Sequence, residues 1–301
     1  MDRAGEKVTT PFMPLETRRG WAWGLQGASL VVLVAFLYAG ILQRLVQQWW
    51  DDPNFSHGFF IPAFSAFVIW QTRKKLAAIP VAPAWWGLGM IAGSLLIMIV
   101  GVLGAELFLS RSSLVFLLAG LAIYFLGWRY FRAMLFPWAI LFLMIPIPAI
   151  VFNRIAFPLQ LLASQFASSL LDTVGVPVLR EGNVIQLPAI TLEVAEACSG
   201  IRSLITLGAL AIIYGYFLER IVSRRVILAI AALPIAVVAN GLRVMGTGLV
   251  GHYWDPAKAH GFFHSFSGWV IFVVSLGLLF SLHAAMNLLG RRGTRPAGSS
   301  P

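Results

Sequence analysis

Long apolar runs alternate with short polar breaks along almost the whole chain. A helix that crosses the hydrocarbon core of a bilayer needs about 20 mostly apolar residues, and about eight segments approach that description. They are residues 22–42, 58–72, 85–105, 113–128, 134–152, 199–218, 226–249 and 265–289. The second is short and the fifth contains prolines at 146 and 148, which membrane helices tolerate. The pattern predicts an all-α polytopic membrane protein.

The longest stretch between predicted spans, residues 153–197, has a different pattern. Its first half is apolar but dotted with Gln, Ser and Asp, which predicts an external amphipathic helix at the membrane interface. Its second half alternates between apolar and polar residues and carries the turn sequence REGN at residues 180–183. That pattern predicts a small β-hairpin just before the sixth span.

The composition agrees with the prediction of a membrane protein. Hydrophobic residues make up 59% of the chain and charged residues only 11%, and the mean hydropathy is +0.82, which excludes a soluble enzyme. The formal charge of +10 does not indicate a nucleic-acid partner, because about two thirds of the 22 Lys and Arg residues fall on one predicted side. That bias predicts cytoplasmic termini and places residues 153–197 outside.

The ends of the chain suggest a simple domain organisation. Residues 1–20 are polar and precede an apolar segment without a small-residue cleavage site, which predicts a cytoplasmic N-terminal segment and an uncleaved first span. Residues 21–290 form one predicted transmembrane domain. Residues 291–301 have no core-forming pattern and are expected to be a disordered cytoplasmic tail.

Three polar residues are predicted to reach the same membrane depth. Cys198, the only cysteine, lies in EVAEACSGIRSL where the chain enters the sixth span, and His264 lies where it enters the eighth. Arg243 of the seventh span lies about 27 Å beyond Arg225, near the outer surface, at a helical rise of about 1.5 Å per residue. A single cysteine also excludes an internal disulfide.

This set of side chains fits nucleophilic catalysis. A thiolate is a nucleophile, a histidine can take and return its proton, and an arginine can stabilise an oxyanion or hold a carboxylate. Arg202 lies one turn after Cys198, and Asn240 one turn before Arg243, which indicates a polar interior face. The simpler alternatives are a packed thiol, an arginine that extends to the headgroups and an interfacial histidine.

A zinc site is a second possibility at the same surface. Imidazoles with a carboxylate can hold zinc, although the sequence has no HExxH-type motif. The residues concerned are His57, His252, Asp255, His260 and His264. We favour a supporting role for these histidines over metal binding, and we expect His283, deep in the last span, to make a polar contact between helices.

Four segments resemble signature regions of the exosortases, the type associated with the PEP-CTERM sorting signal. They are EACSGIRSL at 196–204, NGLRV at 240–244, HSFSGW at 264–269 and the early segment WWDDPNFSHGFFIPAFSAFVIW at 49–70. The resemblance extends over nearly the whole chain, and the combination is specific although each piece is short. It implies a cysteine protease-transpeptidase of the bacterial inner membrane, with the active site facing the periplasm and no cofactor.

The resemblance also implies roles for individual residues. Cys198 would attack near a Pro-Glu-Pro-type motif in a C-terminal tail that continues into a transmembrane helix and a basic cluster, giving a thioester. Arg243 would stabilise the oxyanion or position the substrate, and His264 would handle protons. Transfer to an acceptor linked to lipid, envelope or exopolysaccharide would follow. The expected supporting residues are Glu196, Arg202, Asn240, His57 and His260.

Two other functions remain open from the sequence. A transport or assembly protein for envelope polysaccharide would use Arg243 and the histidines along a solute path, since charges inside the membrane mark such paths. The polar residues cluster at one surface, however, and no matching pair of discontinuous helices is visible. The other alternative is a zinc-dependent membrane hydrolase.

Overall fold

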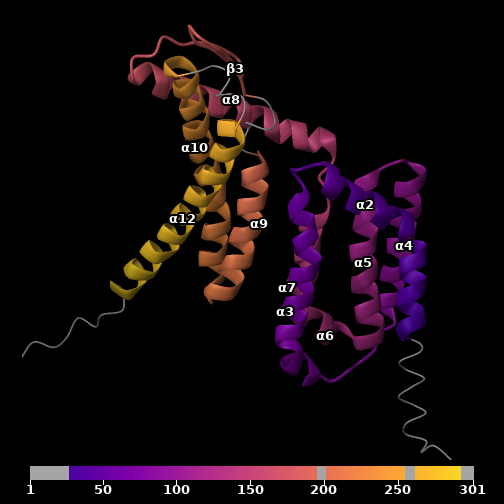
Figure 1. Cartoon of the computed structure of the whole chain (residues 1–301). Coiled ribbons are helices and arrows are strands. Elements are labelled where there is room, and N and C mark those ends of the chain that lie inside the picture. The colour runs from indigo at the N-terminus through magenta and orange to yellow at the C-terminus, as the bar shows by residue number, and fades with distance from the viewer. Residues whose placement is uncertain (1–26, 195–200, 255–261, 293–301) are drawn as a thin grey trace, which may run out of the picture.

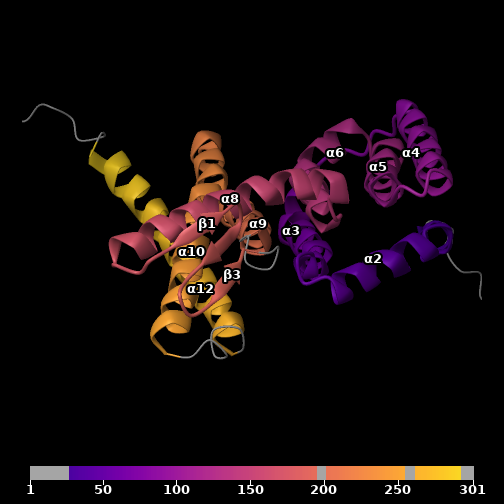
Figure 2. The same ribbon diagram turned by 90° about the horizontal axis from the view of Figure 1, so that it is seen from above.

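The computed structural model describes residues 27–194, 201–254 and 262–292. Two groups of upright helices stand side by side, and one long helix lies across the same end of both (Figure 1). We call residues 27–145 the N-lobe and residues 149–292 the C-lobe. Viewed from above, the long helix runs from the N-lobe over the C-lobe (Figure 2).

Most of the predicted spans are present as helices. Five helices of the described residues are long and apolar enough to cross a membrane, and two bent pairs raise the number to seven if each pair is one span. The five are α4 (Trp86–Leu103), α5 (Leu107–Leu126), α9 (Ile201–Leu218), α10 (Val222–Tyr253) and α12 (Phe262–Arg292). Helix α3 (Phe60–Ala77) covers the predicted second span but falls outside this count. The all-α polytopic fold is confirmed.

Two predicted spans are broken instead of continuous. The first consists of a helix over Gly27–Leu37 and α2 (Ala39–Asp51), with a bend of 65°. The bend falls at Tyr38, which is fully buried and whose Oη lies 3.0 Å from Ser113 Oγ of α5. The sequence carries no proline here, and the buried contact of Tyr38 with α5 lies at the bend.

The predicted span 134–152 breaks at its prolines. It contains α7 (Leu135–Ala139) and η2 (Ile140–Met144), and then α8 (Ala149–Thr173) leaves at 80°. Proline lacks a backbone donor and disfavours a helical residue before it, so the segment 146–148 ends one helix and the next begins after it. Helix α8 is the predicted amphipathic helix, and it begins a few residues earlier than expected.

The N-lobe packs through small residues. Gly101 of α4 lies so close to α5 that an added Cβ would be 2.6 Å from Ser110 N, a close approach typical of helix pairs in membranes. Gly127 ends α5 with a φ of 92° and lies against Ala82 O, where a side chain would clash. Helix α6 (Trp128–Ala133) follows directly.

The predicted hairpin is a three-stranded antiparallel sheet. Strands β1 (Leu179–Glu181) and β2 (Val184–Gln186) form the expected hairpin, with Glu181 opposite Val184. Gly182 has a φ of 64° at the first position of the two-residue turn, as a type II′ turn requires. The third strand, β3 (Thr191–Glu193), pairs with β2 and was missed because it is short.

Helix α8 and the sheet form a cap over the C-lobe. Their shared core contains Ala167, Leu171, Ile185, Leu192 and also Val244 of α10. An added Cβ on Gly248 of α10 would lie 3.2–3.4 Å from three leucines of the cap. The upper part of α10 therefore belongs to the cap, while its lower part packs with α9 and α12 in a second core.

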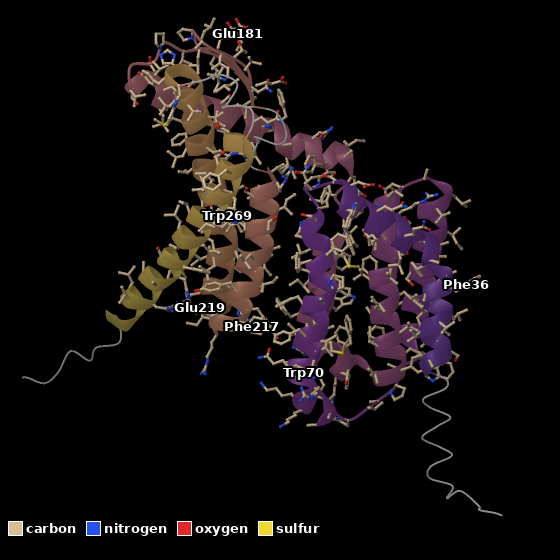
Figure 3. The ribbon with its side chains drawn as sticks, viewed as in Figure 1. Phe36, Trp70, Glu181, Phe217, Glu219 and Trp269 are labelled. Atoms are coloured by element: carbon tan, nitrogen blue, oxygen red, sulfur yellow. The ribbon has the colours of Figure 1, made fainter. Side chains whose placement is uncertain are left out.

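Many of the described basic residues lie at the end opposite the cap. Lys74 and Lys75 lie in the last turn of α3, and the guanidinium of Arg73 lies 4.3 Å from the ring centre of Trp70. Figure 3 shows Trp70, Phe217 and Glu219 toward this end and Glu181 at the cap. Trp70 is 59% exposed, as expected for an aromatic side chain at a membrane interface.

Candidate functional site

Arg243 lies on α10 beside helix α12. An added Cβ on Gly268 would lie 3.6 Å from Arg243 Cζ and 3.8 Å from one of its terminal nitrogens. Gly268 of α12 therefore lies beside the guanidinium of Arg243, at a distance at which an added Cβ would be in ordinary van der Waals contact. Arg243 is half-buried, and its backbone carbonyl accepts a hydrogen bond from Thr247 Oγ1 at 3.0 Å.

The same contact brings Arg243 near the start of α12. His264 belongs to the first turn of this helix, four residues before Gly268. Four residues correspond to about 6 Å along a helix axis, or roughly one turn. The backbone of His264 and the guanidinium of Arg243 are therefore about one helical turn apart along α12.

Helix lengths place Arg243 close to the level at which α9 begins. Helices α9 and α10 pack together and are joined at Leu218 and Val222. Helix α9 has 18 residues, so Ile201 at its start lies about 26 Å from the turn that joins the two helices. The same distance along α10, measured from Val222, ends at about Ala239. Asn240 is 2% exposed at this level, and Arg243 lies one turn beyond it.

Helix α10 continues past Arg243 to Tyr253, four residues beyond the predicted end of the seventh span. Gly241 lies against the ring of Phe166 of α8, where a side chain would clash, and Val244 enters the cap core. Arg243 therefore lies where α10 passes from the three-helix bundle into the cap.

Arg202 connects the C-lobe to the early segment of the chain. It lies in the first turn of α9, and its Nε donates to Asn54 Oδ1 at 3.4 Å. The backbone N–H of Asn54 donates to Asp52 Oδ1 at 2.9 Å, which shapes this corner. Cys198 and Glu196 precede α9 within residues 195–200, and His260 falls within 255–261, so these three candidates lie outside the described residues.

His57 is a buried residue of the N-lobe. Its Nε2 donates to the carbonyl of Leu143 at 3.0 Å, because a carbonyl can only accept, and the ring is 9% exposed. Trp49 Nε1 donates similarly to Met144 O at 2.8 Å. Burial lowers the pKa of His57, which the hydrogen bond to Leu143 offsets only in part. His57 thus holds the segment 52–57 against η2, and Asn54 of the same segment contacts Arg202 of the C-lobe.

The described residues contain no group of three or more His, Cys, Asp or Glu side chains that could hold a metal ion. Of the residues in the zinc alternative, His57 lies in the N-lobe corner and His252 in the last turn of α10. Asp255 and His260 are outside the described residues, and His264 is described by its backbone alone.

A buried polar network at the opposite end of the bundle was missed by the sequence analysis. His283 of α12 bonds Tyr214 Oη through Nδ1 at 2.6 Å and Glu219 Oε1 through Nε2 at 3.0 Å. Glu219 also pairs with Arg224 at 3.5 Å, and Arg224 donates to Asn287 Oδ1 at 3.0 Å. The expected contact of His283 between helices is confirmed. Its partners are 64 and 69 residues away in sequence, so only the isolated glutamate beside a span could have indicated them.

Upright apolar helices with a cap at one end define a multi-pass membrane protein, and its candidate site lies at the capped end of a three-helix bundle. Residues 49–281 match the family model described as transmembrane exosortase, so the chain belongs to the exosortase family. All the candidate site residues lie within the matched region. Comparisons with curated proteins and with solved structures gave no match.

Membership of this family fixes the general activity. Exosortases are membrane protein-sorting transpeptidases that generally depend on a cysteine, and they act on substrate proteins that carry a sorting signal. The chain has one cysteine, Cys198, and it falls within the matched region.

Proposed function

We propose that the chain cleaves PEP-CTERM-type tails with Cys198 as nucleophile and transfers the cleaved protein to an acceptor in the envelope. The observation that carries the proposal is the contact of Arg243 with Gly268, one turn from His264 on α12 and beneath the cap. The proposed groups come from three sequence segments, those of Cys198, Arg243 and His264, and the last two meet at this contact. The segment of Cys198 continues into α9, which begins at nearly the same level of the bundle.

In the first step, the Cys198 thiolate attacks the carbonyl carbon of the scissile peptide bond after His264 accepts the thiol proton. Arg243 donates hydrogen bonds to the oxyanion that forms, since charge-assisted bonds aimed at a developing charge lower the barrier. The carbon–nitrogen bond then breaks, and His264 returns the proton to the leaving amine. The products are a thioester at Cys198 and a free tail.

In the second step, a nucleophile of the acceptor attacks the thioester carbon and releases the thiolate. His264 accepts the proton of that nucleophile and returns it to Cys198, so that protons and charge balance over the cycle. We expect the acceptor to be linked to lipid or polysaccharide. The known dependence of the family on a cysteine supports both steps.

The edge of the cap sheet offers a place for an extended substrate peptide. In the order β1-β2-β3, strand β3 is an edge strand. The bonds Leu187 N to Ile190 O and Val194 N to Asn183 O show that alternate residues of β3 face β2, so Thr191 and Glu193 turn their backbone groups outward. Thr191→Pro should weaken tail binding by strand addition, whereas unchanged binding would exclude this edge.

The proposed orientation puts both termini in the cytoplasm and the cap in the periplasm of a bacterial inner membrane. The gathering of Lys74, Lys75 and Arg129 at the end opposite the cap supports it, because basic residues favour the cytoplasmic side. Proteolytic access to the cap in sealed vesicles of known orientation tests this assignment.

The decisive experiment is to trap the intermediate. The purified protein is mixed with a tail peptide and quenched in acid, and the mass of the peptide containing Cys198 is measured. We expect an added mass equal to the N-terminal cleavage product, lost on treatment with hydroxylamine and absent in Cys198→Ala. Cleavage by Cys198→Ala at the wild-type rate would exclude the mechanism. In cells, accumulation of unexported lipid-linked sugar without unprocessed substrate would favour the transport alternative.

A further inference from the structure

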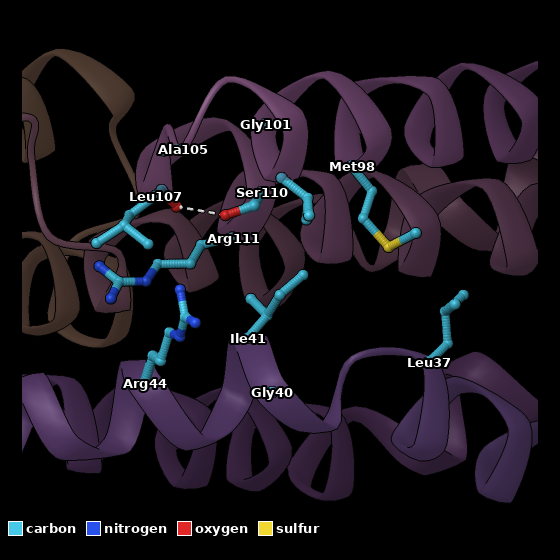
Figure 4. Close-up of a pocket in the computed structure, with 11 residues that line it drawn as sticks. Leu37, Gly40, Ile41, Arg44, Met98, Gly101, Ala105, Leu107, Ser110 and Arg111 are labelled. Carbon is cyan, nitrogen blue, oxygen red and sulfur yellow. Dashed lines mark hydrogen bonds between the residues drawn. The ribbon is translucent and has the colours of Figure 1, made fainter.

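A cavity of about 370 Å³ lies in the N-lobe, away from the candidate site. The helix over Gly27–Leu37 and α2 form one wall, and α4 and α5 form the other (Figure 4). Leu37 and Met98 lie at one end, and Arg44 and Arg111 lie side by side at the other. Its volume is within the usual range of ligand pockets, and its lining is apolar apart from the cationic end.

Arg111 is buried and forms no salt bridge with any described residue. It is only 3% exposed, and one terminal nitrogen donates to Gln48 Oε1 at 2.6 Å. Its Nε is buried and has no hydrogen-bond partner among the described residues. The carboxylate of Glu106 is near enough to attract Arg111, but it forms no ion pair with it and caps α5, where it accepts from Leu109 N at 2.6 Å. Within the described part of the chain, no carboxylate lies within 4.0 Å of Arg111 or Arg44.

A buried guanidinium without an anion is strongly unfavourable, and a second cation beside it adds repulsion. A bound anion removes both penalties, because planar guanidinium groups make paired hydrogen bonds to phosphate oxygens. The apolar remainder of the cavity, with Leu37, Ile41 and Met98, would not suit a free hydrated ion. The cavity therefore fits a molecule with an anionic end and a hydrocarbon end.

We propose that this cavity binds one anionic phospholipid, with its phosphate between Arg44 and Arg111 and an acyl chain along Ile41, Leu37 and Met98. Arg111 is four residues into α5, about 6 Å from the helix start, a depth near the boundary between headgroups and hydrocarbon. This assignment does not depend on the proposed peptide chemistry.

A neighbouring cavity of about 550 Å³ also contains Arg111 but is unsuited to an anion. Asp52 and Glu106 line it, and their carboxylates would repel a phosphate. Its wall includes Asn54, the residue that bonds Arg202. The anion therefore belongs on the side of Arg111 that faces Arg44.

The test measures lipid binding to the purified full-length protein by native mass spectrometry. Phosphatidylglycerol is compared with phosphatidylcholine of the same acyl chains, and sn-glycerol 3-phosphate tests the headgroup without hydrocarbon. We expect one phosphatidylglycerol to be retained at least tenfold more tightly than phosphatidylcholine. Arg44→Gln and Arg111→Gln should each weaken it by about 10- to 100-fold, the effect of one lost charge-assisted hydrogen bond.

Two further variants test the shape of the cavity. Gly40 lines it, and an added Cβ there meets nothing within 4 Å, so Gly40→Leu should fill the cavity without disturbing the helix contacts. Gly89→Leu, at an exposed glycine with equally open surroundings on α4, is the matched control. Arg154→Gln, an exposed arginine on α8, controls for loss of charge.

Several outcomes would overturn the proposal. They are equal retention of the two lipids, equal binding by Arg44→Gln and the wild type, or glycerol phosphate binding as tightly as the lipid. Because Arg111→Gln can affect folding, the exposed Arg44 and Gly40 variants decide the question. Equal losses in Gly40→Leu and Gly89→Leu would also reject the cavity as the site.

Discussion

The two ends of the α9–α10–α12 bundle treat buried polar groups in opposite ways. At the end away from the cap, Glu219 and His283 are 6–7% exposed, and their partners come from all three helices. At the cap end, Arg243 lies against a glycine where α10 changes cores. The first arrangement joins the three helices through side-chain hydrogen bonds and ion pairs, whereas the second lies where α10 passes from one core to the other. Buried polarity alone therefore does not identify a reactive site.

The largest expected effect is on chemistry at the cap end. Arg243→Gln should lower the rate of tail processing by about 10²- to 10³-fold, the usual effect of removing an oxyanion donor. The midpoint of thermal unfolding should change little, because a half-buried amide replaces the guanidinium. Rates are measured with a fluorescent tail peptide. Arg154→Gln is the control, and equal rates in the two variants would contradict the assignment.

At the opposite end, the expected effect is on stability. Glu219→Ala leaves His283 and Arg224 without their carboxylate, and breaking a buried pair in this way costs about 3–5 kcal/mol. The free energy of unfolding is measured by denaturant titration in detergent. Processing per folded molecule should stay near the wild-type value. A rate loss as large as that of Arg243→Gln, without destabilisation, would make this network part of the site.

An intermediate effect is expected at the joint between cap and bundle. Gly241→Leu places a side chain against the ring of Phe166, and overpacking of this kind costs about 1–3 kcal/mol. Gly246→Leu, at a position of α10 with open surroundings, should be nearly neutral. Adding Phe166→Ala should restore much of the stability, because the two sites are in contact. Independent effects of the two changes would show that the clash is relieved elsewhere.

The smallest expected effect is a pH dependence of stability in the N-lobe. Burial lowers the pKa of His57 below the ordinary 6.5, so the unfolded chain binds a proton at a higher pH than the folded one. The stability that the neutral His57 contributes is complete above pH 6.5 and is lost as the pH falls through the pKa of His57 in the folded protein. His57→Gln keeps a donor for Leu143 O and should flatten this part of the unfolding profile. An unchanged profile would assign the acid sensitivity to other groups.

Hydropathy predicted the helices well, because each span must be apolar over a fixed length whatever its neighbours are. The breaks were harder to predict. The bend at Tyr38 depends on a hydrogen bond to Ser113, 75 residues away, and the exit of α8 depends on how the chain leaves η2. The third strand was too short for its alternation to be recognised.

Part of the candidate site could also be predicted, because the fixed rise of a helix relates sequence position to height along it. The level of Arg243 along its helix could be predicted from helical rise, because α10 is continuous from Val222 to Tyr253. What the sequence did not reveal is that Gly268 of α12 lies beside Arg243 and that Asn54 of the N-lobe bonds Arg202. The positions of Cys198 and of the His264 side chain remain predictions.

The 32 residues of α10 span about 48 Å, against a hydrocarbon thickness of about 30 Å. One continuous helix thus belongs to both the three-helix bundle and the cap, and Arg243 lies about 32 Å along it from Val222. On the proposed function, the height of the reaction above the membrane core is built into a single helix. The enzyme would then select its substrates by length, accepting tails in which the spacer between motif and membrane segment matches that height.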